Sequence, residues 1–232
     1  MAACSCEFLN PGNYPIYTNV YGYVQVMGNT LYYESGTGVL EVTEDDTDGN
    51  WHFSDRIFIC CDMLEVNEAG TGYKIHLKNY TPVTVKGVVL QQDADEDALG
   101  SDAITYYEDW GYDRLLKTLD FSVVYAVKAD SGQAHDVNLV FDDTRSTTDS
   151  LFFRLRHNGH GETYENEALT LNDIKTKAEF FSFDISTVMP GVPGDKTVVT
   201  VEGSWYKSTD GQIVSREKDP SEYVATYNLK SN

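Results

Sequence analysis

The densest group of side chains that could carry out chemistry lies around residue 157. His157 and His160 are three residues apart in the chain, and Asn158 and Glu162 lie close by. A His-x-x-His pair at the end of a strand could bring two imidazoles to one metal ion. Glycines flank His160, however, and the sequence fixes no third ligand. We therefore predict no metal and no cofactor. The favoured interpretation is a hydrogen-bonded structural cluster, and ligand recognition is the alternative.

Two acidic segments have the composition of calcium-binding loops. The first contains Asp45, Asp46 and Asp48, and the second contains Asp93, Asp95 and Asp97. An EF-hand loop needs Gly at its sixth position and Glu at its twelfth, because Ca²⁺ requires about six to eight oxygens in a fixed array. Those positions hold Ala98 and Ile104 in one segment, and Trp51 and Ile57 in the other. Both segments are predicted to be solvated acidic loops, and weak calcium binding is the alternative.

No sequence signature of an enzyme is present. The chain lacks G-x-S-x-G, a P-loop, GxGxxG and HExxH, each of which places a reactive group or a phosphate cradle at a defined turn. Glu108 and Asp109 are paired acids of the kind that glycoside hydrolysis uses, but no cleft motif accompanies them. We therefore predict that the protein is not an enzyme.

Aromatic residues form the second candidate surface. The chain has 16 Tyr, and several of them stand near acidic residues. Aromatic rings beside carboxylates can bind sugars, because a ring stacks on the apolar face of a pyranose. The candidate ligand-binding residues are Tyr21, Tyr23, Tyr107, Trp110 and Tyr112. The alternative is that these rings belong to a Tyr-rich β core and to a domain interface.

The charge of the chain narrows the classes of molecule that it could bind. The formal net charge is −20 and no Lys/Arg cluster occurs, so we predict no nucleic-acid binding and no direct adhesion to anionic lipids. The acidity suits solubility, cation condensation or docking to a basic partner.

Cys60 and Cys61 are adjacent on a predicted strand, so they should point to opposite faces, with one buried and the other more exposed. No apolar run approaches the roughly 20 residues of a membrane helix.

The hydrophobic pattern predicts an all-β protein with two domains. Alternation with a period of two residues dominates both halves of the chain. In the first half, alternating segments over 17–27, 31–33, 38–42, 56–66, 73–80 and 83–90 together favour an N-terminal five-stranded OB-like barrel over 13–92. The acidic segment 93–103 is predicted to be a linker. About seven further strands predict an immunoglobulin-like β-sandwich over 104–232.

The segment from Ser150 to Gly161 runs from an alternating strand into a polar Arg-His-Asn turn. It resembles the "L-x-F-R-H-N" signature in the C-terminal domain of NigD-like proteins, carried here by Arg154, Arg156, His157 and Asn158. The order of the surrounding elements is similar to that family from about residue 102 onward, and the resemblance is looser before it. The resemblance implies an envelope lipoprotein of Bacteroidota with an OB-like first domain, and it implies no mechanism.

The start of the chain is similar to the end of a bacterial lipobox. Small residues precede Cys4, so Cys4 is the expected lipidation site and 1–12 the tether. We expect an exported outer-membrane lipoprotein that touches the membrane through this lipid anchor alone. Family members often follow the lipidated Cys with several acidic residues, whereas here Glu7 is the acidic residue that follows nearby. Periplasmic and cell-surface orientations therefore both stay open.

These observations predict a non-enzymatic binding or accessory module. The expected partner is an envelope protein or a glycan, and linkage of the family to a bacteriocin locus implies an immunity or accessory role. The alternative is a fimbrillin-like adhesin or structural surface subunit. That alternative predicts an arginine protease site near the N-terminus, but no Arg precedes Arg56, so it is disfavoured.

Overall fold

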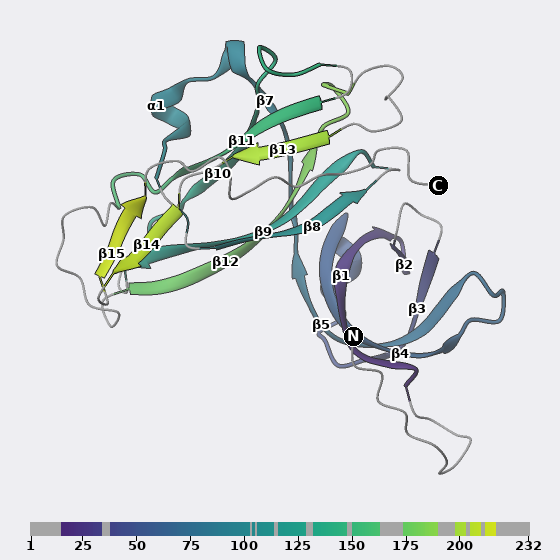
Figure 1. Ribbon diagram of the computed structural model, residues 1–232. Coiled ribbons are helices and arrows are strands. Elements are labelled where there is room, and N and C mark those ends of the chain that lie inside the picture. Colours follow the sequence, from purple (N-terminus) through teal and green to yellow (C-terminus); the bar gives the residue numbers. More distant parts are fainter. Residues whose placement is uncertain are drawn as a thin grey trace. The chain divides into compact units, whose positions relative to one another are not determined.

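The computed structural model consists of strands joined by turns and very short helices (Figure 1). It describes residues 15–33, 38–102, 104, 106–113, 116–128, 132–147, 150–162, 174–189, 198–202, 205–209 and 212–216. The chain divides into two compact units, Met1–Pro82 and Val83–Asn232. Within the described residues, no helix is both long and apolar enough to cross a membrane. The predicted all-β, two-domain fold is confirmed.

The first unit is a closed five-stranded barrel. Its strands are β1 (Tyr17–Met27), β2 (Thr30–Tyr33), β3 (Gly38–Asp45), β4 (Arg56–Val66) and β5 (Gly72–Pro82), and the short 3-10 helix η1 spans Asn50–Phe53. The strand order is β1-β2-β3-β5-β4, with β4 pairing back onto β1. The pair β3–β5 is parallel and the other pairs are antiparallel. This is the OB-like barrel that the sequence predicted.

Apolar side chains from alternate strand positions fill the barrel. The buried set is Val24, Val26, Leu31, Leu40, Trp51, Ile57, Ile59, Cys61, Ile75 and Leu77. Cys61 is fully buried and Cys60 is partly exposed, which confirms the prediction for the adjacent cysteines. Gly72 lies so close to the backbone of Val39 that a Cβ atom would clash with it. A glycine is therefore required where β5 begins alongside β3.

The segment that was predicted to close the barrel belongs instead to the second unit. β6 (Thr84–Gly87) pairs in parallel with β12 (Ile174–Asp184), and β7 (Val89–Leu90) pairs in parallel with β10 (Asp136–Phe141). The division between the units therefore falls after Pro82, earlier than the predicted linker at 93–103. Alternation predicts a strand but not its sheet, because pairing partners are set by contacts distant in sequence.

The second unit is a sandwich of two four-stranded sheets. Its remaining elements are η2 (Gln91–Asp93), α1 (Glu96–Leu99), β8 (Tyr106–Asp113), β9 (Thr118–Lys128), β11 (Ser150–Asn158), β13 (Val198–Glu202), β14 (Trp205–Thr209) and β15 (Gln212–Arg216). The sheet orders are β13-β11-β10-β7 and β6-β12-β9-β8, and β14–β15 forms a separate hairpin. Three pairs are parallel, namely β7–β10, β11–β13 and β6–β12. Both sheets are thus mixed, whereas an immunoglobulin sandwich is antiparallel.

The two sheets enclose one apolar core. On β9, the predicted inner residues Leu119, Phe121, Val123 and Tyr125 are fully buried, and β10, β11 and β12 contribute the remainder. The other face of β9 also carries a buried polar contact, in which the Ser182 hydroxyl donates to Asp120 Oδ1 at 2.6 Å. β9 is therefore buried on both faces, although its alternation resembles that of a strand with one face in solvent.

Candidate functional site

The four residues of the predicted family motif lie on β11, and their side chains point to both faces of the strand. His157 follows Phe153 and Leu155 on the inner face, whereas Arg154, Arg156 and Asn158 lie on the outer face. This division follows from strand geometry, because successive side chains point in opposite directions. The motif therefore supplies two separate sets of contacts.

The outer set holds the segment containing α1 against β11. Arg156 Nη1 lies 2.6 Å from Glu96 Oε2, and Arg156 Nε donates to the Gly100 carbonyl at 2.6 Å. Asn158 Nδ2 donates to the Ala98 carbonyl at 2.7 Å. Arg154 contributes contacts to Glu96, at 3.3 Å, and to Gln91. The acidic segment that was predicted to be a linker is therefore an attached part of the sandwich.

Electrostatics at this contact favours an ionised Glu96. Burial acts to raise the pKa of the Glu96 carboxyl, but the Arg156 and Arg154 guanidinium groups oppose it and hold the pKa below its ordinary value. Asp95 caps α1, since its side chain accepts from the backbone N–H groups of Asp97 and Ala98. Asp95 and Glu96 therefore stabilise the local structure around α1.

The inner set is a buried cluster of two histidines, a tyrosine and a glutamate. His157 Nε2 lies 2.9 Å from His135 Nδ1, and His135 Nε2 lies 3.3 Å from Glu162 Oε2. The Tyr125 ring stacks on His135, with 4.7 Å between the ring centroids and 15° between the planes. Burial, followed by the charge of Glu179, raises the pKa of Tyr125, so its phenol stays neutral.

His160 is separate from this cluster. Its ring Nε2 lies 2.8 Å from Asp136 Oδ2 at the surface, and its backbone adopts a left-handed conformation with φ of 51°. The structure therefore does not bring His157 and His160 together as a ligand pair. In the part of the chain that is described, no group of three His, Cys, Asp or Glu residues is placed to hold a metal ion.

The predicted aromatic residues occupy different places. Tyr21 and Tyr23 lie on β1 around Phe58, with ring centroids 6.3 Å and 5.2 Å from it, and Tyr21 is 55% exposed. Tyr112 packs against the sandwich core, and its hydroxyl donates to Met189 Sδ at 3.4 Å. Cys4 and the side chains of Tyr107 and Trp110 lie outside the described residues.

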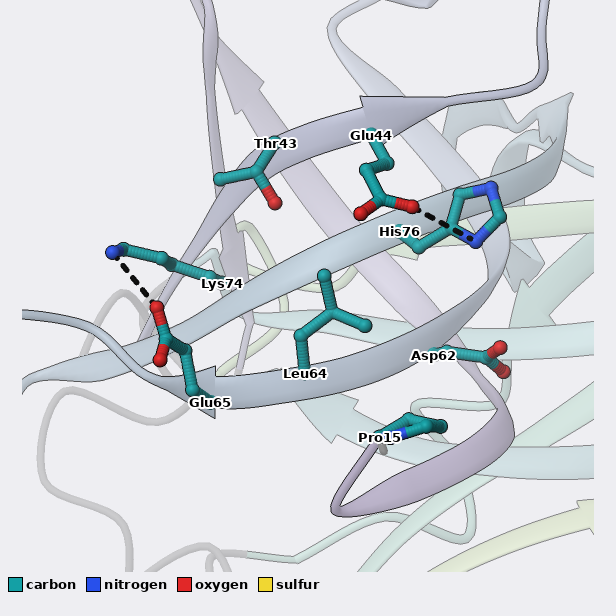
Figure 2. A pocket seen from close by; sticks show the side chains of 8 residues that line it. All are labelled: Pro15, Thr43, Glu44, Asp62, Leu64, Glu65, Lys74 and His76. Carbon is teal, nitrogen blue, oxygen red and sulfur yellow. Dashed lines mark hydrogen bonds and ion pairs between the residues drawn. The ribbon is translucent and has the colours of Figure 1, made fainter. Parts of the chain in front are cut away.

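A pocket of about 610 Å³ lies on the wall of the barrel (Figure 2). Strands β3, β4 and β5 supply all but one of its lining residues, which are Pro15, Thr43, Glu44, Asp62, Leu64, Glu65, Lys74 and His76. Sequence reasoning missed this site because its residues come together through the parallel pairing of β3 with β5. The signal in the sequence was the alternation of Lys74, His76 and Lys78 on β5, whereas Glu44 and Glu65 each follow a register shift in their strand.

Ion pairs define the two ends of the pocket. At one end, Lys74 Nζ lies 2.9 Å from Glu65 Oε1 and 3.8 Å from Glu68 Oε1, and the Glu65 carboxylate raises the pKa of Lys74. At the other end, His76 Nε2 lies 2.9 Å from Asp46 Oδ2, and His76 Nδ1 lies 3.8 Å from Glu44 Oε2. Figure 2 shows Leu64 between these two ends.

Asp62 is fixed in the pocket wall by an irregularity in β1. Asn19 has φ of 52° at a shift of the β1–β4 register, and its backbone N–H donates to Asp62 Oδ1 at 2.8 Å. Lys78 Nζ also lies 2.8 Å from this oxygen. Burial acts to raise the pKa of Asp62, but the Lys78 ammonium and the Asn19 N–H lower it below its ordinary value. This carboxylate is therefore ionised and held in place.

Comparisons with known proteins agree with this architecture. Residues 87–179 match the model of the NigD-like C-terminal beta sandwich domain. A protein of unknown function from Bacteroides vulgatus is 20% identical, with a TM-score of 0.58 over 91% of this chain and 96% of that one. A NigD-like immunity protein from Bacteroides caccae is 16% identical, with a TM-score of 0.58 over 88% and 93% of the two chains.

A proposed lipoprotein from Bacteroides fragilis is 16% identical, with a TM-score of 0.54 over 86% of this chain and 96% of that one. At these identities the solved structures show a shared fold alone. No curated protein matches the chain. The family model covers β7 to the first part of β12, including the β11 motif, and the solved structures extend the likeness to both units. Over residues 87–179 the chain matches the NigD-like family, as the β11 motif predicted.

Proposed function

We propose that the protein is a non-enzymatic envelope lipoprotein that acts as a binding or accessory module, with the barrel pocket as its binding surface. The solved structures of similar fold include one described as an immunity protein and one as a proposed lipoprotein, and both descriptions support this role. The lipid anchor at Cys4 would hold the protein at the outer membrane. The partner is an envelope protein or a glycan.

One observation carries the proposal, namely the contrast between the β11 motif and the barrel pocket. Each of the four motif side chains has a partner inside the fold. The concave surface on the barrel is instead lined by five ionisable residues, of which Glu44 and Glu65 are exposed. Its Thr43 hydroxyl donates to the Ile75 carbonyl at 3.2 Å, so it is not poised as a nucleophile. The pocket is equipped to recognise charge.

A retention experiment tests this proposal. The full chain is immobilised and offered solubilised envelope proteins and envelope glycans of a Bacteroides strain as two separate pools. We expect saturable retention from one pool, and we expect the retained molecules to be recovered chemically intact. The double variant Glu44→Gln/Glu65→Gln should lose this retention.

A matched variant controls for total charge. Asp93→Asn/Asp143→Asn also removes two exposed carboxylates, but from the sandwich unit, so it should retain the partner. Equal retention by the wild type and by both variants would exclude the pocket as the binding surface. Conversion of the retained molecules into products that depends on Glu44 would instead make the protein an enzyme.

A further inference from the structure

The wall of the barrel around the pocket carries more negative charge than its own cations balance. Lys74 interacts with Glu65, Glu68 and Glu41, so three carboxylates share one ammonium group. Lys78 and His76 are in turn surrounded by Asp62, Asp46 and Glu44. Six carboxylates therefore face two lysines and one histidine in the described part of this wall. Such a surface attracts an additional cation.

We propose that this pocket binds a basic peptide segment of a partner protein through the ammonium or guanidinium groups of its Lys and Arg side chains. The inference rests on the proposed function of the chain as a binding module, and it specifies the chemical class of the partner. The formal net charge of −20 for the whole chain favours the approach of the same class of partner.

Glu44 is the group best placed to receive the incoming cation. Its side chain is 64% exposed, and its ion-pair partner among the described residues, His76 Nδ1, lies at 3.8 Å, beyond hydrogen-bond distance. The His76 ring makes its shorter contact with Asp46. The Glu44 carboxylate can therefore accept hydrogen bonds from an ammonium or guanidinium group without losing one that it already makes. Glu65 is also exposed, at 63%, and can share its charge with a second cationic group.

The apolar part of the pocket fits the stem of a basic side chain. Figure 2 shows Leu64 between the Lys74–Glu65 pair and the Glu44–His76 pair, with Pro15 at the lower margin of the same pocket. Lys and Arg cover apolar surface with their methylene groups while their charged ends contact polar partners. A basic side chain lying over Leu64 would thus place its charge at Glu44.

Two other classes of ligand fit the pocket less well. A metal ion requires converging oxygens, whereas these carboxylates are spread over neighbouring strands, and no metal-holding group occurs among the described residues. A sugar favours an aromatic platform, whereas the residues lining the pocket include no Tyr, Trp or Phe. A flexible organic cation needs neither converging oxygens nor an aromatic platform.

Calorimetric titration of the full chain with tetralysine at low ionic strength tests the inference. Tetralysine should bind the wild type, and tetralysine acetylated on its side-chain amines should not. We expect Glu44→Gln/Glu65→Gln to weaken the affinity by about fivefold, because each exposed ion pair contributes modestly. The charge-matched Asp93→Asn/Asp143→Asn variant should change it by less than about twofold. Added salt should weaken binding to the wild type.

Three results would overturn the inference. The first is equal weakening by the pocket variant and the charge-matched variant, since attraction would then come from the total charge of the chain. The second is equal binding of acetylated tetralysine, and the third is no binding of tetralysine. If an envelope pool is still retained through the pocket, the binding-module proposal stands and the basic-peptide class is wrong. If pocket-dependent retention fails as well, both proposals fail.

Discussion

The β11 motif in the sandwich and the pocket on the barrel both gather charged side chains, yet they use them in opposite ways. In the motif, Arg156 and His157 are buried and make close contacts with other parts of the same unit. In the pocket, Glu44 and Glu65 are exposed and belong to a surface with unbalanced negative charge. The comparison indicates that residue types suited to chemistry can serve the fold, while the surface that we propose for recognition consists of plain acidic residues.

Burial accounts for this difference. A buried polar group without a partner costs roughly 1–3 kcal/mol, so side chains such as those of His135 and Glu162 are stable inside the sandwich when they bind one another. Exposed carboxylates on the barrel are solvated and tolerate one another's charge. They can therefore exchange water for a partner's cation, which the buried cluster cannot do.

Replacing His157 with Ala should have the largest effect on stability. The change removes a buried ring that contacts both His135 and Tyr125, and it leaves His135 Nδ1 without its contact to His157. We expect the free energy of unfolding of the sandwich to fall by about 2–4 kcal/mol in urea titrations. His160→Ala, which removes an exposed ring, should cost less than about 1 kcal/mol. Equal stability of the two variants would show that the buried cluster is not structural.

Replacing Arg156 with Ala should have the next largest effect. The variant loses the ion pair with Glu96 and the hydrogen bond to the Gly100 carbonyl, at an expected cost of about 1–3 kcal/mol. Hydrogen exchange should accelerate first in α1, because Arg156 holds that segment. Arg145→Ala is the control, since this arginine is exposed over the Phe152 ring and should contribute under about 1 kcal/mol. Unchanged exchange in α1 would contradict the assigned role.

Acid should weaken the same contact through Glu96. Its pKa is lower in the folded protein than in the unfolded chain, so its contribution is present above the unfolded pKa of about 4.3 and is lost as pH falls through the folded pKa. Because its side chain is half exposed, we expect less than about 1 kcal/mol. Unfolding measured at pH 7 and at pH 3 should show a smaller loss in Glu96→Gln than in the wild type. An identical loss of stability in both proteins would show that Glu96 does not contribute to the effect of acid.

Replacing Tyr21 with Ala should have the smallest effect on stability. Tyr21 is exposed and stacks on Phe58 at the edge of an aromatic group, so the expected change is within about 1 kcal/mol. This variant separates the two candidate surfaces of the barrel. It should retain an envelope partner as the wild type does. Loss of retention in Tyr21→Ala, with retention kept in Glu44→Gln/Glu65→Gln, would move the binding surface to the predicted aromatic residues.

The sequence predicted features that depend on local patterns. Alternation on β9 predicted the inner positions of Phe121 and Tyr125, and the adjacent Cys60 and Cys61 divided between two faces as expected. Features that depend on distant pairing were predicted less well. The strands over 84–90 joined the sandwich, and the acidic segment at Glu96 became a partner of Arg156.

The pocket shows most clearly why part of the candidate site escaped prediction. Glu44 and His76 lie far apart in the sequence and become neighbours through the β3–β5 pairing. Alternation indicates that His76 points outward, but Glu44 has the same parity as the buried Leu40, and a register shift between Val42 and Glu44 accompanies its outward position. His157 and His160 illustrate the converse, because their close spacing suggested a shared ligand, whereas the turn at His160 separates them.

An amide NMR titration of the full chain with tetralysine would test most directly whether the barrel pocket, and not the β11 motif, faces the partner. We expect saturable shifts that cluster at Glu44, Glu65 and Lys74, with the amides of Arg156 and Asn158 unchanged. Shifts centred on β11 and α1, with the pocket amides unchanged, would contradict a binding role for the pocket.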